Sequence, residues 1–262
     1  MAATTHTDLQ AELALAERLA DTARAIARKH FRSPIEVEQK PDLSPVTIAD
    51  REIETEMRRL IRATFPTHGI QGEEFAAEAG NDFTWVLDPI DGTKSFICGM
   101  PLFGALIALV HGDRPVLGIV ESPASLERWI GHVGAPTRLN GQMARTSGCT
   151  RLDRARIYTT SPDAFRDEEW RTYDALSRKA ALRRFGGDCY SYGLLASGHC
   201  DLVIESTLKP HDYLALVPVI EGAGGKVTDW EGNALGLTSS DRIVAAATEA
   251  LWKQAVEGLA RA

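Results

Sequence analysis

The chain has 262 residues, of which 44% are hydrophobic and 25% charged, and its formal net charge is −7 at pH 7. This composition is ordinary for a globular protein with an ample core, and the acidic balance argues against nonspecific nucleic-acid binding. No apolar run approaches the roughly 18 residues that a membrane span needs. The first residues lack the basic and apolar regions of a signal peptide. The four cysteines are scattered, without a Cys-x-x-Cys pair, so we expect a reduced, cytoplasmic protein.

The first part of the chain predicts two helices beside an antiparallel sheet. Apolar side chains recur at helical spacing in residues 8–31 and again in residues 47–63, which is typical of amphipathic helices. The prolines of residues 40–45 predict a loop between the two helices. Runs of apolar residues bounded by turn formers then predict strands, at 84–88, 103–110, 115–121 and 127–133.

The second part alternates strands and helices, which favours a more parallel α/β layer. Residues 134–150 are rich in Gly, Thr, Ser and Pro and form a soft internal boundary within one unit that spans residues 1–262. Beyond the boundary we expect strands at 155–160, 182–185, 201–205, 226–229 and 242–247, and helices at 163–179, 189–197, 210–222 and from 248 onward.

Residues 85–95, Trp-Val-Leu-Asp-Pro-Ile-Asp-Gly-Thr-Lys-Ser, are the most informative stretch. A buried strand should end at Asp88, and Asp91 follows after a turn that Pro89 stiffens. Two carboxylates on a rigid turn suit a hard divalent cation such as Mg²⁺. A short helix that starts after Gly92 would offer free N–H groups to a phosphate. The same residues are also good turn formers, so the motif alone leaves both interpretations open.

Further acidic residues have a structural and a functional interpretation. Asp50 and Asp212 each fall in the first turn of a predicted helix, where a carboxylate complements the helix dipole. Glu73 and Glu74 lie in a Gly-Glu-Glu loop that is typical of a solvated turn, and Glu205 ends a predicted strand. Each could instead supply oxygen ligands to a metal or an acid–base group.

Taken together, these residues resemble the inositol monophosphatase superfamily in their order and spacing. The resemblance runs over nearly the whole chain, from about residue 10 to about residue 250. It implies a layered αβαβα sandwich with mixed α+β and α/β character. The residues that carry it are Lys40, Asp50, Gly72-Glu73-Glu74, Asp88-Pro-Ile-Asp91-Gly-Thr93, Asp212 and Glu221-Gly-Ala-Gly-Gly225.

Within that superfamily the chain is similar to the histidinol-phosphatase branch. One position departs from the inositol monophosphatases, which have Trp before the last metal aspartate where this chain has His211. We interpret His211 as a packing or substrate-lining group rather than as a metal ligand. The stretches similar to the branch are Asp91-Gly-Thr-Lys-Ser-Phe-Ile97, Gly99-Met-Pro-Leu-Phe-Gly104, Gly186-Gly-Asp-Cys-Tyr190 and Leu208-Lys-Pro-His-Asp-Tyr213.

The resemblance implies two or three Mg²⁺ ions in the active site. Glu73, Asp88 and the carbonyl oxygen of Ile90 would hold one ion. Asp88, Asp91 and Asp212 would hold a second. A third and weaker ion would again involve Glu73. These are the hard oxygen ligands that Mg²⁺ prefers.

The resemblance also implies how the other residues act. Glu73 and the hydroxyl of Thr93 would orient the attacking water, while Asp50 would accept the hydrogen bond of Thr93 and help to move the proton. The backbone N–H groups of Gly92 and Thr93 would bind the phosphate. Lys40 would lie near the third ion.

The histidinol-phosphatase branch implies hydrolysis of L-histidinol phosphate in histidine biosynthesis, and the superfamily resemblance implies a homodimer. A site for histidinol should offer carboxylates to its ammonium group, and Asp188 and Glu205 are the candidates. Glu205 lies seven residues before Asp212, as the alcohol-contacting glutamate does in the inositol enzymes. Two alternatives stay open, an inositol or related sugar-alcohol monophosphatase and a non-catalytic sensor of a phosphorylated metabolite.

Overall fold

The computed structural model describes residues 9–40 and 45–260. Its α-helices are α1 (Gln10–His30), α2 (Ile48–Thr64), α3 (Thr93–Ile97), α4 (Asp167–Ser177), α5 (Asp188–Ala196), α6 (Pro210–Tyr213), α7 (Leu216–Gly222) and α8 (Glu249–Ala260). Its strands are β1 (Val37–Gln39), β2 (Pro45–Thr47), β3 (Gly69–Gly72), β4 (Phe83–Asp91), β5 (Gly104–His111), β6 (Arg114–Ser122), β7 (Glu127–His132), β8 (Arg138–Leu139), β9 (Gln142–Met143), β10 (Arg156–Thr159), β11 (Leu182–Phe185), β12 (Leu202–Glu205), β13 (Lys226–Asp229) and β14 (Ile243–Ala246). Of the loop predicted at 40–45, residues 41–44 lie outside the described part.

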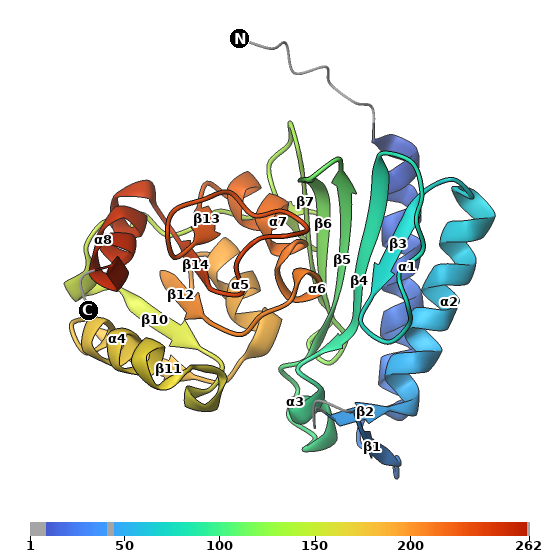
Figure 1. Cartoon of the computed structure of the whole chain (residues 1–262), viewed down its shortest axis with the longest axis horizontal. Coiled ribbons are helices and arrows are strands. Elements are labelled where there is room, and N and C mark those ends of the chain that lie inside the picture. Colours follow the sequence, from blue (N-terminus) through green and yellow to red (C-terminus); the bar gives the residue numbers. More distant parts are fainter. Residues whose placement is uncertain (1–8, 41–44, 261–262) are drawn as a thin grey trace.

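The chain forms five layers (Figure 1). Helices α1 and α2 cover one face of a seven-stranded sheet, and α5, α6 and α7 lie between that sheet and a five-stranded one. Helices α4 and α8 cover the outer face of the second sheet. This order confirms the αβαβα sandwich predicted from the sequence. Among the described helices, none has the length and apolar character needed to cross a membrane.

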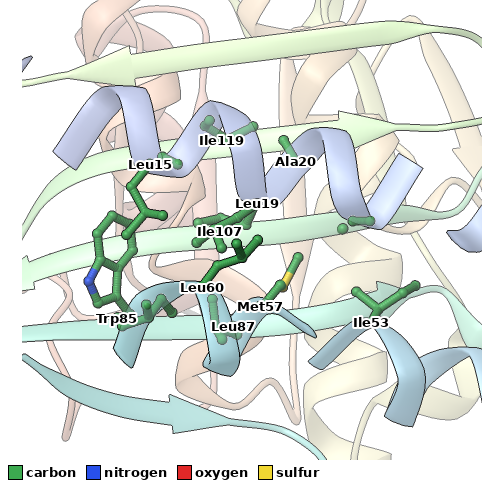
Figure 2. Close-up of a cluster of buried hydrophobic side chains, with 14 of the residues drawn as sticks. Leu15, Leu19, Ala20, Ile53, Met57, Leu60, Trp85, Leu87, Ile107 and Ile119 are labelled. Atoms are coloured by element: carbon green, nitrogen blue, oxygen red, sulfur yellow. The ribbon is translucent and has the colours of Figure 1, made fainter. Parts of the chain in front are cut away.

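The apolar faces of α1 and α2 form the first core. Leu19 of α1 and Met57 of α2 are fully buried and lie over Ile107 of β5 (Figure 2). Each fully buried side chain of this size contributes roughly 1.5–3 kcal/mol. The apolar residues that recur at helical spacing in the sequence therefore form the face by which these helices pack on the sheet.

The seven-stranded sheet brings the Gly-Glu-Glu segment to the end of β4. Strands β4 to β9 pair antiparallel in sequence order, whereas β3 adds to the edge as a parallel strand. Strand β3 was not predicted, because Gly-Ile-Gln-Gly is short and Ile70 is its only residue of a type enriched in strands. Its register places Gly72 opposite Leu87. Glu73, the next residue, is therefore level with Asp88.

The prediction of a more parallel second layer was only partly right. Strand β10 pairs parallel with β11 and β12, but β14 pairs antiparallel with both β12 and β13. No helix lies between β13 and β14, so that connection lacks the crossover that parallel neighbours need. Strands β8 and β9 fall within residues 134–150 and belong to the first sheet. The predicted internal boundary there stays a prediction.

The single helix predicted at 210–222 is divided into α6 and α7. Pro218 has no N–H group to donate to the carbonyl of Leu214, which interrupts the helical ladder at that point. Leu214 and Ala215, between the two helices, keep right-handed helical dihedrals, and α6 lies against β4.

Two glycines allow α7 to approach the first sheet closely. A Cβ atom on Gly118 would lie 2.0 Å from the carbonyl oxygen of Ala215, and one on Gly131 would lie 2.3 Å from that of Pro218. Any side chain at either glycine would therefore push the backbone of this segment away from β6 and β7. The glycines thus fix the distance between the middle helices and the first sheet.

Candidate metal and phosphate site

Strand β4 delivers two carboxylates to one turn. Asp88 lies near its end and Asp91 closes it, and the pairing with β5 is irregular between these residues. Gly92 then adopts a φ of 82°, and α3 begins at Thr93. A residue with a Cβ atom is strained at such a φ. Glycine therefore turns the chain directly from the strand into the helix start.

The third carboxylate comes from far along the chain. Pro210 starts α6, where its missing N–H group removes no helical bond. The backbone N–H of Lys209 donates a 2.6 Å hydrogen bond to Oδ2 of Asp212. Asp88, Asp91 and Asp212 each contribute an oxygen to a group in which all the oxygens lie within 4.8 Å of one another.

The electrostatics of this group fit a divalent cation. Burial raises the pKa of Asp88 well above its usual value, and the charges of Glu73 and Asp91 add to the rise. Burial also raises the pKa of Asp91 and of Asp212. Within the described part of the chain, Oδ1 of Asp88 is buried without a hydrogen-bond partner, which is costly for a polar atom. Crowded carboxylates with an unsatisfied oxygen are suitable ligands for a hard cation.

Glu73 follows β3 and lines the same cavity as Asp212. Lys40 donates hydrogen bonds of 2.7 Å to Oε1 of Glu73 and 2.6 Å to Oε1 of Glu74. Burial disfavours the charge of Lys40, but the two glutamates hold its pKa above the ordinary value. Burial raises the pKa of Glu74 to about 7. The fold thus brings Lys40 and Glu73 together, and their roles at a metal stay predictions.

Asp50 and Thr93 differ from the expected arrangement. Thr47 donates to Oδ2 of Asp50 from its backbone N–H at 2.9 Å and from its hydroxyl at 2.6 Å, which caps α2. The hydroxyl of Thr93 donates to the carbonyl oxygen of Ile90 at 3.1 Å instead of to Asp50. Burial raises the pKa of Asp50 to about 6, and its Oδ1 is another buried oxygen that has no partner among the described residues.

A cavity of about 620 Å³ opens beside the carboxylates. Gly92, Asp188 and His211 are among the residues that line it. Ser95 donates a 2.7 Å hydrogen bond to Oδ2 of Asp188, and a Cβ atom on Gly92 would lie 2.7 Å from that oxygen. Nε2 of His211 lies 3.6 Å from Oδ1 of Asp212. His211 thus lines the cavity, and its packing or substrate-lining role stays a prediction.

Glu205 ends β12 and is buried next to the cavity wall. Its Oε1 accepts hydrogen bonds from the N–H of Thr160, at 2.9 Å, and from the hydroxyl of Thr160, while its Oε2 accepts one from the hydroxyl of Tyr192 at 2.8 Å. Thr160 lines the cavity, and Glu205 is not among the described residues that do. Burial raises the pKa of Glu205 to about 7. Direct contact with a substrate would require the cavity wall to open toward Glu205.

Sequence reasoning missed several residues that hold the predicted ones. The N–H of Cys189 donates a 2.5 Å hydrogen bond to Oδ2 of Asp91. Tyr192, which lies in α5, donates its hydroxyl hydrogen bond to the carboxylate of Glu205. Glu54 accepts a 2.7 Å hydrogen bond from the N–H of Glu74. One signal was available for Glu54, because a charged residue interrupts the apolar stripe of its helix. No sequence pattern links Cys189 or Tyr192 to its partner.

Comparison with known proteins agrees with the fold. The solved structure of an inositol monophosphatase from Zymomonas mobilis is similar, with a TM-score of 0.89 and 44% identity, and the match covers 97% of this chain and 100% of that one. The layered fold is thus that of a class of phosphatases. Residues 8–262 match the inositol monophosphatase family model, and the chain belongs to this family, which confirms the resemblance seen in the sequence.

Two relatives with descriptive names are also phosphatases. A protein of Arabidopsis thaliana described as bifunctional phosphatase IMPL2, chloroplastic, is 46% identical, over 97% of this chain and 76% of that protein. A histidinol-phosphatase of Chlorobaculum parvum is 36% identical, over 84% of this chain and 86% of that protein.

Proposed function

We propose that this protein is a Mg²⁺-dependent phosphomonoesterase that hydrolyses L-histidinol phosphate to L-histidinol and phosphate, as a step of histidine biosynthesis. The observation that carries the proposal is the convergence of Asp88, Asp91 and Asp212 within 4.8 Å. They adjoin a cavity lined by Gly92 and Thr93 at the start of a helix. Carboxylate oxygens suit a hard cation, and backbone N–H groups at a helix start suit a phosphate.

The donor set fits Mg²⁺, which when bound lowers the pKa of water and neutralises charge on the phosphoryl oxygens and the leaving alkoxide. Uncatalysed hydrolysis of a phosphomonoester is extremely slow, so such stabilisation is needed. The residues that would hold two or three ions are Glu73, Asp88, Ile90 through its carbonyl oxygen, Asp91 and Asp212.

The remaining residues of the site orient the reactants. The N–H groups of Gly92 and Thr93 bind the phosphate. The carboxylate of Glu73 and the hydroxyl of Thr93 orient the attacking water, and for this the hydroxyl turns away from the carbonyl of Ile90. Asp50, with a pKa of about 6, takes part in moving the proton that the water gives up. Water adds to phosphorus, the bond to the ester oxygen breaks, and the alcohol leaves with a proton.

Selection of histidinol would depend on negative charge around the leaving group. Asp188 lines the cavity next to Gly92, where its carboxylate can pair with an ammonium group. Glu205 would add a second charge from behind the cavity wall, which Thr160 forms. The identity to a protein named histidinol-phosphatase supports this substrate, whereas the similarity to the Zymomonas inositol monophosphatase favours a sugar-alcohol phosphate.

The deciding experiment compares kcat/KM for histidinol phosphate and inositol 1-phosphate at saturating Mg²⁺. A clear preference for histidinol phosphate is expected, and a preference for inositol 1-phosphate would replace the proposal with the sugar-alcohol alternative. Hydrolysis of p-nitrophenyl phosphate that depends on Mg²⁺ separates an enzyme from a sensor. If none of the three esters is hydrolysed, the sensor alternative is favoured.

We also propose that the protein is a homodimer, which light scattering of the purified protein would test. The expected cytoplasmic location stays a prediction, since the Arabidopsis relative is described as chloroplastic.

A further inference from the structure

A buried ion pair lies inside α2, away from the cavity. Glu54 and Arg58 are four residues apart on this helix, and Nε of Arg58 donates a 2.8 Å hydrogen bond to Oε1 of Glu54. Both side chains are buried, with side-chain exposures of 0% for Glu54 and 4% for Arg58. Taking two charges out of water carries a large desolvation penalty. The further partners of the pair show what it does.

Both side chains bind the backbone of the segment that follows the metal-site glutamate. Glu54 accepts hydrogen bonds from the N–H of Glu74 at 2.7 Å and from the N–H of Phe75 at 3.3 Å. Arg58 donates to the carbonyl oxygen of Phe75 at 3.0 Å and to Oε1 of Glu78 at 2.7 Å. The pair therefore holds the loop by its main chain, independently of the side chains that face the cavity.

The same carboxylate also touches the residue before the metal-site glutamate. A Cβ atom on Gly72 would lie 1.9 Å from Oε1 of Glu54, and its three nearest atoms would all belong to that carboxyl group. Gly72 is not among the described glycines with a positive φ, so its backbone would accept alanine. Glycine is needed at this position because Glu54 packs directly against it.

We propose that Glu54, held by Arg58, is a positioning residue that sets the place of Glu73 at the metal centre. Glu54 contacts the chain on both sides of Glu73, at Gly72 and at Glu74. The inference rests on the proposed role of Glu73 as a ligand of Mg²⁺. A ligand whose backbone is fixed binds a cation without first losing conformational freedom, so the ion pair contributes to metal affinity from outside the coordination sphere.

The test is the affinity of metal-free protein for Mn²⁺, a probe that accepts the same oxygen ligands, measured by calorimetry. Glu54→Gln keeps the size of the side chain but removes the charge that holds Arg58. We expect the Kd for Mn²⁺ to rise about tenfold or more, while kcat at saturating Mg²⁺ changes much less. Glu56→Gln is the matched control, because Glu56 lies on the same helix in an exposed pair with Arg59. It should leave the Kd unchanged.

Gly72→Ala provides a second route to the same effect if Glu54→Gln fails to fold. The added methyl group displaces the Glu54 carboxylate and should weaken Mn²⁺ binding in the same way. A folded variant of either kind that binds Mn²⁺ with wild-type affinity would overturn the inference. If the wild-type protein hydrolyses no phosphomonoester but the variants bind Mn²⁺ more weakly than it does, the proposed function fails while the positioning role is retained. If the wild-type protein hydrolyses its substrate and the variants bind Mn²⁺ as tightly as it does, only the positioning role is refuted.

Discussion

Replacing Glu205 with glutamine should stabilise the metal-free protein at pH 8 while it weakens turnover of a cationic substrate. Burial raises the pKa of Glu205 from 4.5 to about 7. Between pH 4.5 and about 7, Glu205 therefore keeps its proton in the folded protein but has lost it in the unfolded chain. The favourable contribution is fully present below pH 4.5 and is lost as the pH rises through 7. Glutamine carries no charge and avoids this loss.

The magnitude follows from the contacts of Glu205. A rise in pKa from 4.5 to about 7 corresponds to about 3 kcal/mol at pH 8. Glutamine keeps an acceptor for both hydrogen bonds of Thr160, but its amide group meets the hydroxyl of Tyr192, and the altered bond costs about 1 kcal/mol. The net gain at pH 8 is about 2 kcal/mol, or roughly 4–8 °C in Tm. At pH 5 the variant should be slightly less stable than the wild type.

Thermal unfolding at pH 5 and pH 8, followed by circular dichroism without Mg²⁺, measures the difference between variant and wild type. Tyr192→Phe is the matched control. It removes a donor but keeps the carboxylate, so it should destabilise the protein more at pH 8 than at pH 5. Equal destabilisation of Glu205→Gln at both pH values would refute the reasoning.

The same variant tests the substrate. A charge-assisted hydrogen bond contributes roughly 1.5–3 kcal/mol, so kcat/KM for histidinol phosphate should fall about tenfold to a hundredfold or somewhat more. Hydrolysis of p-nitrophenyl phosphate should be spared. If both substrates suffer equally, Glu205 belongs to the shared catalytic machinery. If neither is affected, selection of the substrate resides elsewhere.

Three further outcomes are expected. Asp88→Asn should lower kcat on the order of 10²–10³-fold in a folded protein, because an amide cannot supply the charge of a ligand; near-wild-type turnover at saturating Mg²⁺ would contradict this. Thr93→Ala should lower kcat by about 10²-fold or more while calorimetry finds nearly unchanged metal affinity, since only the hydroxyl is lost. A matching loss of affinity would argue against its role in orienting water. Ca²⁺ should inhibit at fixed Mg²⁺, because it prefers longer bonds and looser geometry; full turnover with Ca²⁺ alone would show that the proposed sites are wrong.

Local patterns in the sequence predicted those helices and strands whose own residues determine the pattern. The apolar spacing of α1 and α2 predicted their buried faces, because a helix repeats its contacts every three or four residues. Strand β3 was not predicted, because its pairing with the parallel strand β4 stabilises it more than the strand propensity of its own residues does. The orientation of β14 likewise depended on how the chain returns after β13.

The same distinction holds for the site. Asp88 and Asp91 were predicted as a pair because one turn joins them, whereas family resemblance was needed to add Asp212 from the other end of the chain. The hydrogen bond of Thr93 to Ile90 was not predicted, because the choice between two nearby acceptors depends on geometry finer than residue spacing. Glu54 was missed for a similar reason, since its partners lie in another segment.

Part of the cavity wall comes from residues that are not among the proposed cation ligands. Asp88 and Asp91 belong to a strand of the first sheet, while Thr160 follows β10 of the second sheet and Asp188 starts α5. Substitutions in the second set can reshape the space around the alcohol and leave the cation ligands untouched. On this scaffold the shape of the cavity can thus change through a few substitutions in one region while the proposed cation ligands stay the same.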